Sequence, residues 1–182
     1  MPSKQRGGLE TLELLRSKLV EGTHIEVLHP SASAWPAYFT FHEAATDDDI
    51  AHAEQALGVS LPETYKVFLR RYNGARLYYD NEYLQWGFQL YGTGDIASQN
   101  EHWRHVYEEI RSRPYIVFEK SFGDVELLAF DTSQPTKDGK DYRVTDISSI
   151  FPRDWEPAAP SFDTWLERLI VAQGEKYWQW YA

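Results

Sequence analysis

The sequence predicts a single domain that combines helices and β-strands, and three observations support this. The chain has 182 residues, within the range of about 100–200 residues that usually forms one domain. Hydrophobic residues make up 42% of it, including seven Trp, twelve Tyr and nine Phe, which is typical of a globular protein. Apolar residues recur at both helical and strand spacings. We therefore expect one domain over residues 1–182.

The first 45 residues are expected to form a helix followed by two strands. A stripe of Leu9, Leu12, Leu15 and Leu19 predicts a helix over residues 9–21 that Gly22 closes. The stretches HIEVLHP (24–30) and YFTFHEA (38–44) alternate apolar and polar residues as strands do. Pro30 and the stretch SASAWP mark the loop between them.

Residues 46–74 predict two helices joined by a short turn. Thr46 is placed to cap the first helix, and the three aspartates after it favour the positive end of the helix dipole. Gly58 supplies a left-handed residue that ends this helix. Pro62 suits the first position of the second helix, and Asn73-Gly74 ends it. The stripe of this helix that we expect in the core consists of Tyr65, Phe68, Leu69 and Tyr72.

The rest of the chain is expected to alternate strands with two more helices. Strands are predicted over residues 75–79, 83–92, 114–120, 125–131 and 142–147, with a hairpin turn at 121–124 and a polar loop at 134–141. Ser98 and Glu101 have capping-box spacing and start a helix that carries Trp103, Val106 and Ile110 and ends at Pro114. Ser161 caps a last helix, which Gly174 closes before an aromatic tail over residues 174–182.

The formal net charge of −10 bears on the choice of partner. A strongly acidic surface repels phosphate, so the composition argues against nucleic acid as a direct ligand. The same surface would attract a basic protein and speed its approach. The simpler explanation of the acidic charge is that it keeps the protein soluble, because net charge affects solubility whether or not there is a charged partner.

Three features that the sequence lacks bear on its compartment. It has no cysteine, which excludes disulfides, thiol catalysis and cysteine-ligated zinc and fits a reducing compartment. The first ten residues, MPSKQRGGLE, lack the apolar core of a secretory signal. No apolar run is long enough to span a bilayer. We therefore expect a cytoplasmic protein that does not enter a membrane.

Candidate catalytic and metal-binding residues are few. YGTGDIA holds a lone Gly-x-Gly without the third glycine of a dinucleotide site, so we interpret it as a turn. His102, His105 and Glu109 have spacings that would let them share a helix face and bind a metal, but an ordinary surface face is the simpler interpretation. Asp131 in LLAFDTS resembles the turn of aspartic proteases, which needs a second carboxylate, whereas a side-chain turn that ends a strand needs none. We predict no catalytic residue, no cofactor and no metal.

The stretch LYYDNEYLQW (77–86) is the candidate for partner binding. It interleaves aromatic residues with Asp80 and Glu82, and aromatic anchors with an acidic rim are typical of a surface that docks a basic protein. A hairpin whose rings pack inward explains the same pattern and is the slightly simpler interpretation. The residues that we place in the partner surface are Tyr79, Asp80, Glu82 and Trp86, followed by Glu101 and Glu108.

The stretch AEQALGVSLPETYKVFLRRYNG resembles the signature of the SMI1/KNR4 (SUKH) superfamily. The matching positions are Glu54, Leu57-Gly58, Leu61-Pro62, Tyr65, Phe68-Leu69 and Asn73-Gly74. FGD, LLAFDTSQP and SFDTWLERLI also look like that family, so the resemblance covers residues 46–171. Two segments depart from the family pattern. The N-terminal helix and extra strands span residues 9–45, and residues 22–45 of this segment add about two strands before the signature. The tail after Gly174 is also additional.

The resemblance implies an α+β fold with a mostly antiparallel central sheet flanked by helices. Bacterial members of the family are widespread as immunity proteins of polymorphic toxin systems, often neutralising nuclease toxins by direct binding, and fungal relatives act as regulatory interaction modules. The family is not known by a catalytic constellation, and its signature residues are structural. We therefore predict a non-catalytic binding module whose basic partner is a cognate toxin domain. A regulatory scaffold, or a hydrolase that uses Asp131 or His102 and His105, are the alternatives.

Overall fold

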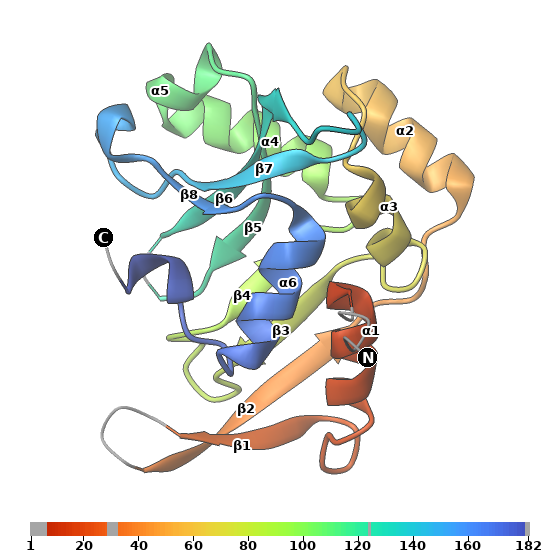
Figure 1. The fold of residues 1–182 in the computed structure, drawn as a ribbon, viewed down its shortest axis with the longest axis vertical. Helices are drawn as coiled ribbons and strands as arrows, with labels where there is room; N and C mark the ends of the chain where they lie inside the picture. Colours follow the sequence, from red (N-terminus) through yellow and green to blue (C-terminus); the bar gives the residue numbers. More distant parts are fainter. Residues whose placement is uncertain (1–6, 29–32, 124, 181–182) are drawn as a thin grey trace.

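The computed structural model describes residues 7–28, 33–123 and 125–180, and this part of the chain forms one eight-stranded sheet with helices on both sides (Figure 1). The strands are β1 (His24–Leu28), β2 (Ala34–Phe41), β3 (Ala75–Tyr79), β4 (Phe88–Leu90), β5 (Tyr115–Ser121), β6 (Leu127–Pro135), β7 (Tyr142–Asp146) and β8 (Glu156–Ala159). Each strand pairs antiparallel with the next along the chain, so β1 and β8 are the two edges. The α+β class with an antiparallel sheet is therefore confirmed.

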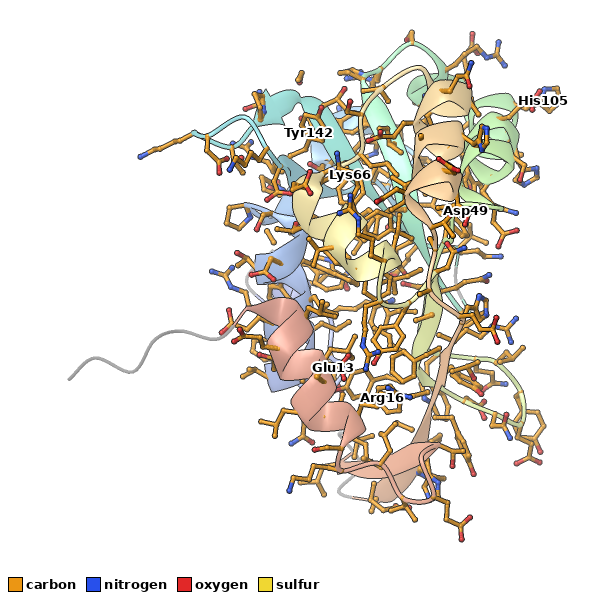
Figure 2. The ribbon with its side chains drawn as sticks, turned by 90° about the vertical axis from the view of Figure 1, so that its right-hand side faces the viewer. Glu13, Arg16, Asp49, Lys66, His105 and Tyr142 are labelled. Carbon is orange, nitrogen blue, oxygen red and sulfur yellow. The ribbon has the colours of Figure 1, made fainter. Side chains whose placement is uncertain are left out.

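The helices lie on the two faces of the sheet. They are α1 (Gly8–Arg16), α2 (Asp47–Leu57), α3 (Glu63–Leu69), α4 (Ile96–Val106), α5 (Glu108–Arg111) and α6 (Phe162–Val171), with short 3-10 turns η1 (Pro152–Asp154) and η2 (Tyr177–Gln179). Helices α1 and α6 pack against each other on one side, whereas α4 packs on β5 from the other side (Figure 2). The β1–β2 hairpin extends from the far end of the sheet (Figure 1).

The core between α6, α3 and the sheet is built from aromatic rings. Tyr65 of α3 meets Phe162 of α6 edge-on with ring centroids 4.8 Å apart, and Phe118 stacks on Phe130 at 4.2 Å. The four residues of the predicted stripe, Tyr65, Phe68, Leu69 and Tyr72, are all buried. This confirms that the helix packs this face into the hydrophobic core. Each fully buried ring of this kind contributes about 1.5–3 kcal/mol through the hydrophobic effect.

The start of α3 explains why the matching signature positions are structural. Pro62 is the N-cap and not the first helical residue, and it has no side-chain oxygen to accept the N–H groups of the first turn. Asp141, the last residue of the β6–β7 loop, accepts hydrogen bonds from the backbone N–H and the hydroxyl of Thr64, both at 2.9 Å. The carboxylate of Glu54 accepts the N–H of Leu61 at 2.8 Å. The segment is thus held from α2 and from the β6–β7 hairpin.

The predicted N-terminal elements differ from the structure in length. Helix α1 ends at Arg16, and Gly22 (φ +73°) lies in a separate turn where Val20 bridges to His24. The chain must reverse direction to enter β1, and a helix through residue 21 would prevent this. Residues 29 and 30 of the predicted strand 24–30 lie outside the described residues. Strand β2 begins four residues before the predicted one, because β1 offers partners to residues 34–37.

In the middle of the chain, α3 and β4 are shorter than predicted. Helix α3 ends at Leu69, and of the pair Asn73-Gly74 that was expected to close it, Gly74 alone is left-handed (φ +91°). The strand predicted over residues 83–92 reduces to β4, because residues 81–85 are held in a loop by Asp80.

Farther along the chain, a single predicted helix is divided and one strand is additional. The helix begins at Ile96 after Asp95, so Ser98 is not its cap, and it breaks at Tyr107 into α4 and α5. Strand β8 was not predicted, because its sequence EPAA has low strand propensity.

The polar loop is shorter than predicted, and the hairpin turn is shifted along the chain to residues 122–126. Strand β5 runs through Ser121 and β6 through Pro135. In the part of the chain that the structure describes, no helix is long and apolar enough to cross a bilayer.

Candidate functional site

The loop between β3 and β4, residues 80–86, is organised by Asp80. Its side chain is buried, and its carboxylate accepts the backbone N–H of Glu82 at 2.9 Å and of Tyr83 at 3.2 Å. Its own backbone N–H donates to the carbonyl of Trp86 at 3.2 Å. Carboxylates that accept neighbouring N–H groups in this way fix a turn. Asp80 therefore shapes the loop from within and offers little surface to a partner.

Tyr79 is also part of the framework of this loop. It is 9% exposed, and its hydroxyl forms a hydrogen bond with that of Thr40 at 2.9 Å. The backbone of Gly87 (φ +111°) packs directly against Tyr79, and a Cβ atom added to Gly87 would lie 2.4 Å from the Tyr79 Cα. Only glycine permits both this φ and this approach. The loop is consequently held firmly at both of its ends.

The outer side of the loop borders a hollow of about 620 Å³, which we call the acidic hollow. It is lined by Trp35, Pro36, Tyr38, Asp80, Asn81, Glu82, Tyr83, Gln85 and Trp86. Glu82 is exposed and Tyr83 is 66% exposed, and the carboxylate of Glu82 raises the pKa of the Tyr83 hydroxyl. Both groups can thus reach a partner, and of the predicted residues Glu82 and Trp86 line the hollow with accessible side chains.

Trp86 pairs with Trp35, a residue that the sequence placed in a loop. The ring centroids are 4.4 Å apart and the planes are tilted by 58°. The pair connects the β1–β2 hairpin to loop 80–86, and both rings also line a second hollow of about 440 Å³. We call this second hollow the tail groove, because its opposite wall is formed by residues 173–176, 179 and 180.

The C-terminal tail is held against the sheet by specific contacts. The indole N–H of Trp178 donates to the carboxylate of Asp146 at 2.9 Å, and the hydroxyl of Tyr177 donates to the carbonyl of Ala158 at 3.1 Å. Lys176 forms an ion pair with Glu126. The hydrogen bond to Ala158 places the tail beside the edge strand β8.

A buried carboxyl group lies under the tail groove. Glu119 of β5 is fully buried, and its Oε1 accepts a hydrogen bond from the hydroxyl of Ser121 at 3.1 Å. Its Oε2 has no hydrogen-bond partner within the described chain. Burial raises the pKa of this carboxyl well above its usual range. Because Ser121 also lines the groove, Glu119 lies one side chain beneath it.

Glu101 and Glu108 are not brought together with loop 80–86. Both are exposed, on α4 and α5, and these helices lie at the opposite end of the molecule from the turn between β3 and β4 (Figure 1). The predicted partner residues therefore form two separate surfaces. The partner-binding role of either surface stays a prediction.

The candidate catalytic residues occupy structural or isolated positions. His102 and Glu109 are exposed on α4 and α5, which the break at Tyr107 separates, and Figure 2 shows His105 on the outer side of α4, directed away from the sheet. Within residues 7–28, 33–123 and 125–180, no three His, Asp or Glu side chains are grouped as metal ligands. Asp131 accepts the N–H and hydroxyl of Ser133 at 3.0 and 2.6 Å, a side-chain turn within β6 and not at its end.

Comparison with known proteins places the chain in a family. It matches the SMI1 / KNR4 family (SUKH-1) over residues 44–168, more than half of its length. It is 25% identical over 177 residues to the uncharacterized protein YobM of Bacillus subtilis (strain 168), covering 94% of this chain and 90% of that protein. It is 27% identical over 150 residues to the uncharacterized protein YnaB of the same organism, covering 79% of this chain and 88% of that protein. The matched residues begin after β2 and end within α6, and the chain therefore belongs to the SMI1/KNR4 family (SUKH-1).

Proposed function

We propose that this chain is a non-catalytic protein-binding module that acts in the cytoplasm and neutralises a toxin domain by covering its basic active cleft. The observation that carries the proposal is the firmly held loop 80–86, which exposes Glu82 and Tyr83 beside the Trp35–Trp86 pair. Family membership supports a binding role, because the resemblance to this family implies immunity proteins that act by direct binding. A nuclease is the favoured partner, because its cleft must be basic to hold phosphate.

The mechanism would combine steering with burial of aromatic surface. The net charge of −10 attracts a basic protein over distances up to roughly a Debye length, about 8–10 Å at physiological salt. After contact, the rings of Tyr83 and Trp86 would be desolvated against the partner, as aromatic residues at the centre of interfaces are. Charge would therefore set the association rate, and the rings would set the dissociation rate.

The test compares charge reversals at the two separate surfaces. A partner is first identified by affinity capture from the native cell and by the genes on either side, and its domain is then purified. Glu82→Lys should slow association about tenfold at low ionic strength, and the difference should shrink as salt is added. Glu108→Lys makes the same change of charge at the other end of the molecule and should have a much smaller effect.

The outcomes separate the candidate functions. If Glu108→Lys slows association and Glu82→Lys does not, the interface lies on α5 and the assignment to loop 80–86 is wrong. If the captured partner is not a toxin domain and the chain protects no cell against one, the regulatory scaffold is the better description.

A further inference from the structure

The tail groove has the aromatic walls of a site for a positively charged side chain. Its volume of about 440 Å³ lies within the range of roughly 300–1,000 Å³ that is usual for ligand sites. The rings of Trp35, Trp86, Phe122 and Trp180 line it. Aromatic faces attract the ammonium or guanidinium group through the ring quadrupole, and tryptophan does so most strongly.

The charges around the tail groove have the sign that a cation requires. Glu175 lines it with an exposed carboxylate. Lys176 also lines it, and the carboxylate of Glu126 balances its charge. With Lys176 balanced in this way, the net charge of the side chains that line the groove is therefore negative.

Two residues that line the groove keep a costly backbone conformation. Tyr78 has φ +51° and Gln173 has φ +54°, the left-handed region that bulky side chains rarely adopt. Tyr78 lies where the β2–β3 register shifts. Its ring is so close to Gly174 that a Cβ atom added to Gly174 would lie 2.6 Å from the Tyr78 Cγ. Strained backbone of this kind is concentrated at functional sites, because the strain persists only where the surroundings impose it.

Opposite walls of the groove come from outside the family-matched region. Trp35 belongs to the β1–β2 hairpin, and Trp180 to the C-terminal tail, and both lie beyond residues 44–168. Ser121 and Trp86 come from within that region. The groove is thus assembled by attaching two further segments to the family framework, as a site for a particular partner would be.

We propose that the tail groove binds an arginine side chain of the protein partner, with its guanidinium group against the indole rings and the carboxylate of Glu175. The inference rests on the proposed function, because the arginine belongs to the basic surface of the partner. Arginine suits the site better than lysine, because its planar group stacks on aromatic rings while its N–H groups still reach a carboxylate.

The test uses two defined peptides and needs no knowledge of the partner. The peptide Gly-Gly-Arg-Gly-Gly is titrated into isotopically labelled protein, and the tryptophan indole N–H signals are followed by NMR. The control peptide carries citrulline, which has nearly the shape of arginine but no charge. We expect the arginine peptide to shift the Trp86 and Trp180 signals and the citrulline peptide to bind roughly two- to fivefold more weakly.

Variants locate the binding site on one side of the Trp35–Trp86 pair. Trp180→Ala and Glu175→Gln change exposed side chains. Each should weaken the binding of the arginine peptide roughly two- to fivefold. Glu82→Gln removes a carboxylate of the acidic hollow and should leave binding of the peptide unchanged.

Three results would overturn the inference. They are equal binding of the two peptides, undisturbed indole signals, or loss of binding in Glu82→Gln but not in Trp180→Ala. None of them affects the association test of Glu82→Lys, so a failure of the groove assignment is distinguishable from a failure of the proposed function.

Discussion

The ring of Phe68 shows how much one side chain contributes to the core. It is fully buried, with ring centroids 5.7 Å from Tyr65 and 5.4 Å from Phe162. Phe68→Ala should lower the free energy of unfolding by about 3–5 kcal/mol, because it leaves a cavity among these rings. The neighbouring Val67 is 44% exposed, so Val67→Ala is a matched control with a small expected effect. An unchanged urea midpoint for Phe68→Ala would refute the packing described for α3.

Glu119 makes the stability of the protein depend on pH in a direction opposite to that of a paired carboxylate. In the unfolded chain this group ionises near its ordinary pKa of 4.5, whereas burial raises its pKa in the folded protein. Between these two values unfolding releases a proton, so this group's contribution to stability falls as the pH rises. Glu119→Gln removes the effect and should gain stability relative to the wild type as the pH rises from about 4 to 8. Urea unfolding of both proteins across that range measures the difference, and parallel curves would contradict the assignment.

At the scale of the element, α3 depends on Asp141, which lies 77 positions after its partner Thr64. The N-cap of α3 is Pro62, and the acceptor for the Thr64 N–H is the carboxylate of Asp141. Asp141→Ala should lower the free energy of unfolding by about 0.5–2 kcal/mol, the usual effect of removing a cap. Asp141→Asn keeps an acceptor oxygen and should lose much less. Equal losses for the two variants, measured by urea unfolding, would show that the charge of Asp141 and not its hydrogen bond supports α3.

The same example shows which elements can be predicted from the sequence. The cap by Thr46 and the left-handed Gly58 depend on neighbours within a few positions, and both are present as predicted. The bond that Asp49 accepts from the Thr46 backbone, which completes a capping box, was not predicted. The cap from Asp141 and the pairing of Trp35 with Trp86 depend on residues that are distant in sequence and are brought together by the fold. Composition identified the aromatic and acidic character of loop 80–86. It gave no sign that Asp80 faces inward, because burial depends on tertiary contacts.

At the scale of the whole molecule, the C-terminal tail joins parts of the fold that are distant in sequence. The indole of Trp178 lies 6.3 Å from the ring of Phe88 in β4 and 6.4 Å from that of Trp165 in α6, and it donates to Asp146 of β7. Trp178→Ala should therefore lower the free energy of unfolding on the order of 2 kcal/mol. Trp180 is 58% exposed, and Trp180→Ala should change the free energy of unfolding by less than about 0.5 kcal/mol. Similar urea midpoints for the two variants would mean that the tail adds nothing to the fold.

The closeness of the indoles of Trp35 and Trp86 also has an optical consequence. Two such chromophores at a 4.4 Å separation and a 58° tilt couple their electronic transitions, which gives a paired positive and negative band in circular dichroism. A guest that wedges against either ring would alter the relative orientation and therefore the band shape. The protein thus carries an intrinsic, label-free spectroscopic reporter at the boundary between its two hollows.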